Sequence, residues 1–188
     1  MDVFLIRHTK PENSAGLCYG RLDLGVGPDF AAAAERLPPH LPKQAPIVTT
    51  DAQRCMRLAA YLSVELGSPL RVDARLQELN FGQWEGRLWA DIPRVQTDVW
   101  ARDVWGLSPP GGETYAELFA RLGAAWESLL QSQAESLMVV GTAGPLRALI
   151  AIALELPVDS SLRFHLDYGG FAKLSDSTGG WRLDFANR

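Results

Sequence analysis

The chain has few cysteines, few histidines and no long hydrophobic run, and each scarcity excludes a class of protein. Cys18 and Cys55 are its two cysteines, and their spacing matches neither a zinc site nor a thioredoxin-type motif. The longest apolar stretch, residues 148–154, is far too short to span a bilayer. The formal net charge of -4 argues against nucleic-acid binding, which needs clustered lysine and arginine. We therefore expect no membrane and no nucleic-acid partner.

What is present is the composition of a globular protein, with 47% hydrophobic and 21% charged residues. The length of 188 residues suits one domain, residues 1–188, with a sizeable core. No basic region is followed by a long apolar run at the N-terminus, so we expect no secretory signal and a cytoplasmic protein. Reduced thiols, acting as small polarizable side chains, are the expectation for both cysteines, and a disulfide between them is the alternative.

Strand and helix patterns alternate along the chain, which predicts an α/β fold with a mostly parallel sheet covered on both faces. Strands are predicted at 3–6, 46–50, 70–72 and 137–141, with a closing hairpin formed by 171–174 and 181–185. Helices are predicted at 30–37, 52–66, 113–133 and 145–154. The result is a three-layer α/β/α sandwich.

Several residues are predicted to lie at the beginnings or ends of these helices. Asp51 is placed to cap the helix at 52–66, and Gly67 to end it. Glu113 is expected in the favourable first turn of the helix at 113–133. Residues 78–112 carry four tryptophans among proline, glycine and charged residues, and we expect this excursion to pack over the top of the sheet.

Arg7 and His8 end the first predicted strand, before a turn of lysine, proline, glutamate and asparagine. In an open parallel sheet, ligands bind outside the carboxyl ends of such strands. Arginine binds phosphate oxygens as a fork, and a neutral imidazole beside it can accept a phosphoryl group. The alternative is an ordinary strand end whose polar residues face solvent.

Two further segments add groups suited to phosphate chemistry. Arg54 is predicted in the first turn of a helix that follows a strand, where the helix N-terminus also favours anions. Glu78 lies in sequence among Leu76, Leu79 and Phe81, and a carboxyl in apolar surroundings can hold a proton near neutral pH. The alternatives are a solvent-exposed helix arginine and a surface glutamate in a loop.

Together these segments resemble the histidine phosphatase superfamily, the relatives of cofactor-dependent phosphoglycerate mutase, in order and over essentially the whole chain. Arg7-His8-Thr9 is similar to the family's Arg-His-Gly signature, and Gln53-Arg54-Cys55 is similar to its arginine segment. The family's acid-bearing loop is similar to Glu78 with Phe81-Gly82-Gln83-Trp84-Glu85-Gly86. Its Gly-Glu-Ser turn is similar to Gly112-Glu113-Thr114.

The resemblance implies a phosphoglycerate mutase-like fold and hydrolysis of a small phosphorylated substrate. His8 would form a phosphohistidine, Arg7 and Arg54 would bind the phosphoryl oxygens, and Glu78 would act as acid and then base. No metal or other cofactor is implied, because the arginines supply the charge that Mg²⁺ supplies elsewhere.

Residues 16–23, Gly-Leu-Cys-Tyr-Gly-Arg-Leu-Asp, resemble a segment of the α-ribazole phosphatases of the cobalamin pathway. This resemblance implies that Tyr19 and Arg21 contact the substrate, and that the substrate is α-ribazole 5′-phosphate. The alternative is a tight turn beside the site. A mutase is a less favoured interpretation, because we find no counterpart to the mutases' extra acid-binding segments.

One family residue is missing. Residues 139–147 resemble the segment that carries the family's second histidine, but Thr142 stands in its place. We expect Thr142 to bind phosphate through one neutral hydrogen bond, without the charge of an imidazolium. His40 and His165 are not expected to replace it. Reduced phosphatase activity is the prediction, and an inactive phosphate-ligand binder or scaffold is the alternative.

Overall fold

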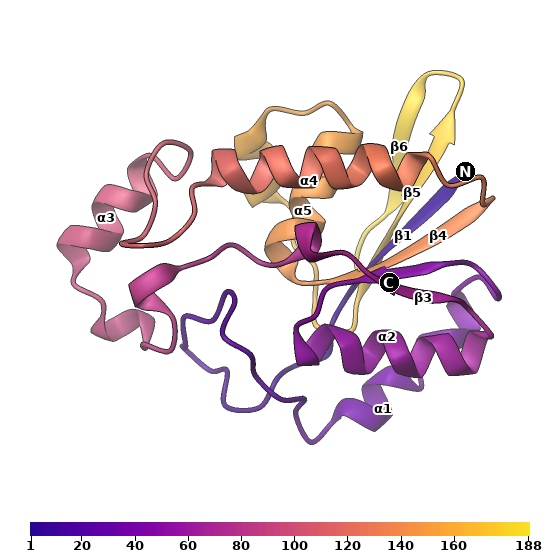
Figure 1. The fold of residues 1–188 in the computed structure, drawn as a ribbon, viewed down its shortest axis with the longest axis horizontal. Helices are drawn as coiled ribbons and strands as arrows, with labels where there is room; N and C mark the ends of the chain where they lie inside the picture. The colour runs from indigo at the N-terminus through magenta and orange to yellow at the C-terminus, as the bar shows by residue number, and fades with distance from the viewer.

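The computed structural model of the chain describes all of residues 1–188 and contains one six-stranded sheet (Figure 1). Its strands are β1 (Asp2–Arg7), β2 (Ile47–Thr49), β3 (Leu70–Val72), β4 (Ser136–Gly141), β5 (Phe171–Ser177) and β6 (Gly180–Phe185). Their order across the sheet is β3-β2-β4-β1-β5-β6. The first four strands in this order pair in parallel, and the last two are antiparallel additions. The predicted mostly parallel sheet is confirmed.

Helices cover both faces of this sheet, as predicted (Figure 1). They are α1 (Phe30–Ala34) and α2 (Gln53–Leu66) on one face, and α4 (Tyr115–Leu130) and α5 (Ala143–Ala153) on the other. Alternate side chains of a strand point to opposite faces. In β1, Val3 and Leu5 pack toward α4 and α5, whereas Phe4 and Ile6 pack toward α1 and α2. The three-layer sandwich therefore has two hydrophobic cores.

The two ends of α2 compare differently with the prediction. Gly67 ends the helix as predicted, with a φ of 63° in the left-handed region that favours glycine. Asp51 does not cap it, because the Asp51 carboxylate accepts hydrogen bonds from the Gln77 side chain instead. The Gln53 amide donates to Asp23 Oδ1 at 2.8 Å, so a residue from a distant loop binds the helix start.

The start of α4 is also different from the prediction. The Thr114 hydroxyl accepts a bond from the Glu117 amide, and the Glu117 carboxylate accepts one from the Thr114 amide. This reciprocal capping box begins the helix at Tyr115, so Glu113 precedes it rather than lying in its first turn. The Glu113 carboxylate binds Arg121 instead, at 2.6 Å.

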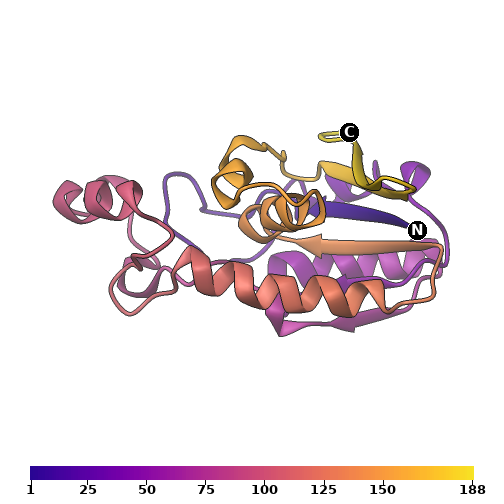
Figure 2. The same cartoon turned by 90° about the horizontal axis from the view of Figure 1, so that it is seen from above.

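Residues 78–112 extend beyond the end of the sheet, in Figures 1 and 2 to the left of the main body. Phe81, Trp84, Trp89 and Trp100 form an aromatic cluster with ring centroids 5.4 to 6.4 Å apart. The excursion contains a helix that the sequence did not predict, α3 (Arg94–Arg102). None of its residues is buried, and five of its nine residues are polar or charged, so its short apolar side gives only a weak sequence signal.

The cysteines are free and buried in different places, which agrees with the predicted reduced thiols. Cys18 packs near Trp84, and Cys55 packs in the core beneath α2. Burial raises the pKa of both thiols to about 12, so neither is a reactive thiolate. No helix of the structure has the length and apolar character that crossing a membrane requires.

Candidate active site

Three neighbouring parallel strands bring most of the predicted site residues to one edge of the sheet. Because β4 lies between β2 and β1, the carboxyl ends of these three strands are adjacent. Arg7 pairs with Gly141, and the His8 amide donates to the Gly141 carbonyl oxygen at 3.0 Å. Thr142 follows Gly141 directly, and Arg54 lies in the first turn of α2, just after β2. The strand order therefore assembles one site from segments far apart in the sequence.

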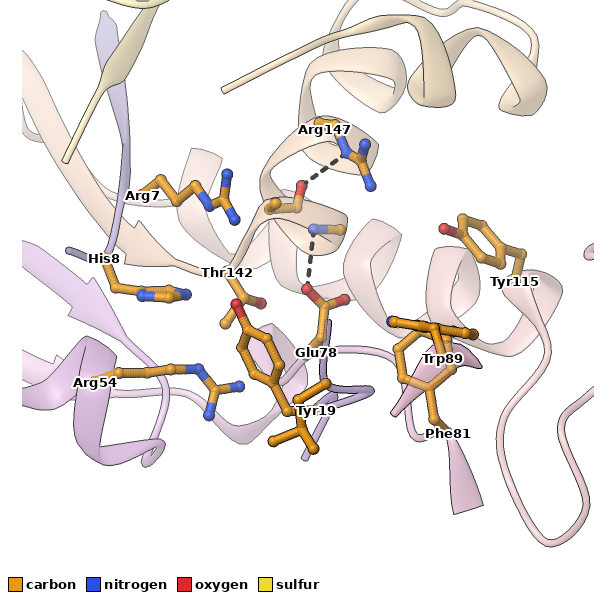
Figure 3. Close-up of a pocket in the computed structure, with 13 residues that line it drawn as sticks. Arg7, His8, Tyr19, Arg54, Glu78, Phe81, Trp89, Tyr115, Thr142 and Arg147 are labelled. Carbon is orange, nitrogen blue, oxygen red and sulfur yellow. Dashed lines mark hydrogen bonds between the residues drawn. The ribbon is translucent and has the colours of Figure 1, made fainter. Parts of the chain in front are cut away.

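A cavity of about 280 Å³ lies at this edge (Figure 3). Six of the seven predicted site residues line it, and Arg21 does not. The lining residues are Arg7, His8, Leu17, Tyr19, Arg54, Glu78, Phe81, Trp89, Tyr115, Thr142, Ala143, Gly144 and Arg147. Neither His40 nor His165 is among them, and both are exposed to solvent elsewhere, as expected.

His8 is held as a neutral imidazole with one nitrogen free. Its Nδ1 lies 2.7 Å from the Thr9 carbonyl oxygen. Because a carbonyl oxygen only accepts hydrogen bonds, Nδ1 carries the proton and Nε2 keeps its lone pair. Burial, with Arg54 and Arg7 nearby, lowers the pKa of His8 from 6.5 to about 3. His8 thus presents an unprotonated Nε2 at neutral pH, as a nucleophile requires.

Three arginines line the cavity without a carboxylate partner. Arg7 donates to the Leu166 carbonyl oxygen and stacks on Tyr168, with its guanidinium carbon 3.7 Å from the ring centroid. Arg54 and Arg147 likewise form no ion pair. The Nε atoms of Arg7 and Arg54 are buried and have no hydrogen-bond partner. Buried cations without counter-ions are costly, so the arrangement suits an anionic ligand.

Thr142 contributes a hydroxyl without a partner. It is the N-cap residue of α5, but its side chain makes no capping hydrogen bond. The Oγ1 atom is buried and unbonded, and the residue is 2% exposed. A helix N-terminus attracts anions, and a hydroxyl beside it can donate to one oxygen of such an anion. The neutral donor predicted at this position is therefore available.

Glu78 lies between the end of the cavity formed by His8 and Arg54 and its aromatic end (Figure 3). Its surroundings are more polar than the sequence predicted, because the Leu79 amide donates to Oε1 at 2.8 Å and the Gly144 amide to Oε2 at 3.0 Å. A Cβ added at Gly144 would lie 2.1 Å from Glu78 Oε1. Glycine at position 144 therefore allows the carboxylate to reach the start of α5.

Two tyrosines cover the site. The Tyr19 and Tyr168 hydroxyl groups form a hydrogen bond with each other, although 149 residues separate them. Tyr168 packs on His8 with ring centroids 5.5 Å apart, and the Tyr19 ring centroid lies 5.3 Å from the Arg54 guanidinium carbon. Burial and the Tyr168 hydroxyl raise the pKa of Tyr19, so its phenol stays protonated. Sequence reasoning missed Tyr168, which lies in a loop without any motif.

The loop that carries Tyr19 is held by Glu85. Its carboxylate accepts four backbone N–H groups at 2.8 to 2.9 Å, those of Gly20, Arg21, Leu22 and Phe81. From the other side, Arg54 donates to the carbonyl oxygens of Gly20 and Leu22. Glu85 therefore positions Arg54 and Tyr19 without lining the cavity. Glu85 belongs to the segment that resembles the family's acid-bearing loop, but the sequence indicates no role for it.

Arg21 lies outside the main cavity. Its guanidinium forms an ion pair with Glu113 at 3.3 Å and donates to the Glu78 carbonyl oxygen. It lines a separate polar hollow beside Arg54. The substrate contact predicted for Arg21 from the resemblance is therefore not placed at this cavity, because Glu113 draws the side chain toward α4.

The far end of the cavity is aromatic. Phe81, Trp89 and Tyr115 lie opposite His8 and Arg54 (Figure 3), and Leu17 also lines the cavity. Sequence reasoning assigned none of them to the site. Trp89 and Phe81 come from the excursion, whose path cannot be deduced from local pattern. The cavity thus joins an anion site to a flat apolar compartment.

Comparisons with known proteins identify a matching sequence family and similar folds. A sequence profile described as "Histidine phosphatase superfamily (branch 1)" matches residues 3–188. A protein of Hydrogenobacter thermophilus, named a phosphoserine phosphatase, is 27% identical over 180 residues, covering 92% of this chain and 88% of its own.

Solved structures show the same fold. A mycobacterial glucosyl-3-phosphoglycerate phosphatase superposes with a TM-score of 0.84 at 27% identity, covering 99% of this chain and 98% of its own. The α-ribazole phosphatase of Shigella flexneri superposes with a TM-score of 0.91, covering 100% of this chain and 96% of its own. Its identity is 22%, so that likeness concerns the fold alone.

We predict that His8 makes the protein less stable in mild acid. Below pH 6.5 the unfolded chain binds a proton at this residue, whereas folded His8, with a pKa of about 3, does not. Between pH 7 and pH 5 the wild type should therefore lose about 2 kcal/mol more unfolding free energy than His8→Asn. Urea denaturation at both pH values measures this. His40→Asn, at an exposed histidine, should follow the wild type, and parallel behaviour of wild type and His8→Asn would contradict a buried neutral imidazole.

We predict that Glu85→Gln disorders the site. Glutamine offers one acceptor oxygen and a donating NH₂ group to four backbone N–H groups, so some amides lose their partner at about 1–3 kcal/mol each. Urea denaturation should show reduced stability, and calorimetry should show weaker binding of inorganic phosphate, because Arg54 loses the support of the loop. Glu127→Gln, at an exposed position of α4, is the control. If both variants bind phosphate equally well, Glu85 does not position the site.

Proposed function

This chain belongs to the histidine phosphatase superfamily, and we propose that it is a phosphomonoesterase that acts through a phosphohistidine on His8. The observation that carries the proposal is the free Nε2 of a buried neutral His8 in a cavity with three arginines that lack carboxylate partners. A nucleophile and surplus positive charge are both needed for phosphoryl transfer, whereas a structural cavity needs neither.

In the first step, His8 Nε2 attacks the phosphorus of the bound ester. The new P–N bond forms as the P–O bond to the alcohol breaks, and Glu78 donates a proton to the departing oxygen. Arg7 and Arg54 lie beside His8 and bind the equatorial oxygens, on which charge is spread in the transition state. The Nδ1 hydrogen bond to the Thr9 carbonyl oxygen stabilises the positive charge that develops on the ring.

In the second step, water attacks the phosphorus of the phosphohistidine. Glu78, now a carboxylate, accepts a proton from this water as the P–N bond breaks and His8 returns to its neutral form. The amides of Leu79 and Gly144 hold the Glu78 carboxyl group in place for both transfers. Inorganic phosphate then leaves.

The rival function is that of an inactive phosphate-ligand binder or scaffold, and Thr142 is the observation that favours it. The threonine hydroxyl supplies one neutral donor where the family has an imidazole. Loss of one well-placed donor to developing charge lowers turnover by about two to three orders of magnitude. We therefore propose reduced activity rather than none, because a binder has no need for the free Nε2 of His8 or for Glu78.

The substrate we propose is α-ribazole 5′-phosphate, the substrate of an enzyme of cobalamin biosynthesis. The resemblance of residues 16–23 supports it, and so does the aromatic compartment, since α-ribazole carries a flat benzimidazole base. The base would lie against Trp89 and Phe81 while the phosphate binds near His8. Free buried thiols support the proposed cytoplasmic location.

Two esters that differ only by the base test this proposal. α-Ribazole 5′-phosphate and ribose 5-phosphate share the same primary alcohol, so the aromatic compartment should give the former a kcat/KM about tenfold higher or more. Steady-state phosphate release measures the ratio. Trp89→Ala should reduce it, whereas Trp105→Ala, a similarly exposed tryptophan outside the cavity, should not.

The control for the reaction itself is His8→Ala with the same esters and with p-nitrophenyl phosphate. Equal kcat/KM values for the two ribosyl esters would remove α-ribazole 5′-phosphate as the substrate. Turnover that persists in His8→Ala would contradict a phosphohistidine on His8. If the wild type turns over none of these esters, the inactive phosphate-ligand binder or scaffold is the better interpretation.

We predict that Thr142→His raises phosphatase turnover by about a hundredfold or more, which is the value of one well-placed donor to developing charge. Thr142 lines the cavity, so a ring at this position can extend into it. Because the added charge complements the transition state, kcat should rise more than KM falls. Steady-state kinetics on p-nitrophenyl phosphate measures this.

The same rise should disappear in the double variant with His8→Ala, because the second histidine assists the nucleophile and cannot replace it. If Thr142→His folds normally and turnover does not increase, the cavity has lost its catalytic geometry, and the binder is the better interpretation.

A further inference from the structure

Arg147 is a cavity residue that neither the sequence motifs nor the mechanism above uses. It lies one turn into α5, the helix that begins at the position of the missing histidine. It is half-buried, lines the same cavity as His8 and Thr142, and takes part in none of the ion pairs of the chain. A half-buried guanidinium without a carboxylate partner is available to a ligand.

The side chain of Arg147 is directed back toward the start of the helix. Long side chains on a helix lean toward its N-terminus, over the preceding turn. Arg147 Nε donates to the Ala143 carbonyl oxygen at 3.2 Å, which anchors the guanidinium beside the residue that follows Thr142. Figure 3 shows it at the first turn of α5, between the side chains of Arg7 and Tyr115. The two terminal nitrogens form no hydrogen bond, so both remain free to donate.

The charge balance of the cavity depends on this residue. Glu78 is the one carboxylate that lines the cavity, and its oxygens already accept the amides of Leu79 and Gly144. His8 is neutral at neutral pH. Arg7, Arg54 and Arg147 bring three positive charges to the cavity and Glu78 at most one negative charge, so the cavity is positive overall, which suits a phosphomonoester dianion. Arg147 supplies one of these three positive charges.

We propose that Arg147 binds the phosphoryl group from the side on which Thr142 offers no charge, and so takes over the electrostatic part of the missing histidine's role. The proposal rests on the proposed phosphatase function. Arg147 is then a catalytic residue that stabilises the negative charge developing on the phosphoryl and leaving oxygens. A guanidinium cannot be the nucleophile, and the two proton transfers stay with Glu78.

The test is a cycle of variants at positions 142 and 147. Arg147→Met keeps much of the side-chain length and removes the charge. In the Thr142 background it should lower kcat for p-nitrophenyl phosphate by about tenfold or more, with a smaller change in KM. In the Thr142→His background the loss should shrink to about threefold or less, because the new imidazole supplies the same charge. Arg147→Lys, which keeps the charge, should recover part of the activity.

Arg163→Met, at an exposed arginine outside the cavity, is the matched control and should leave kcat unchanged. Circular dichroism and thermal unfolding check that each variant folds. An equal kcat loss from Arg147→Met in both backgrounds would overturn the proposal, because it would show that the two positions act independently. An effect confined to KM would also overturn it, since Arg147 would then recognise the alcohol part of the substrate.

A binding measurement separates this proposal from the proposed function. Calorimetric titration with inorganic phosphate needs no turnover, and Arg147→Met should weaken affinity by about tenfold relative to Arg163→Met. If the wild type shows no turnover but Arg147→Met still weakens phosphate binding, the phosphatase function fails and the contact stands. If phosphate binds both variants equally, Arg147 does not contact the phosphoryl group.

Discussion

The site depends most on how Gly20–Leu22 is held between a carboxylate and a guanidinium. Glu85 accepts the amides of this segment, and Arg54 donates to its carbonyl oxygens. Each group satisfies one side of the loop backbone, which would otherwise carry unpaired polar atoms beside the cavity. The same loop extends to Tyr19 above the cavity and to Asp23 at the start of α2. These hydrogen bonds therefore fix the positions of Arg54, Tyr19 and the start of α2 together.

The second constraint is that the arginines of the cavity have no carboxylate partner. Folding buries Arg54 and half-buries Arg7 and Arg147 without giving any of them a carboxylate, and it keeps His8 neutral through burial. Backbone carbonyl oxygens and aromatic rings offset part of the cost. The remaining positive potential is fixed in place before a phosphate arrives, so little reorganisation is needed when charge develops during transfer. Stability is thus given up locally in favour of a ligand that neutralises the site.

The sequence predicted the sheet and three of the seven expected site residues for one physical reason. Short apolar runs followed by polar residues identify buried strands and their carboxyl ends, which is where Arg7, His8 and Arg54 lie. Features that depend on distant partners could not be predicted in this way. Asp23 rather than Asp51 binds the start of α2, and Arg21 is drawn to Glu113. Tyr168 packs on His8 and Trp89 lines the cavity, and both reach these places along paths without local pattern.

The central claim is that Nε2 of His8 becomes phosphorylated. In Glu78→Gln the second step lacks its base, whereas p-nitrophenyl phosphate releases a weakly basic alcohol that needs no acid, so the phosphoenzyme should accumulate. Alkaline quench followed by peptide mass spectrometry and ³¹P NMR locates the phosphate. We predict phosphate on Nε2 of His8, because Nδ1 is bound to the Thr9 carbonyl oxygen. Phosphate on Nδ1, on another residue, or on none while p-nitrophenol is released would contradict the account.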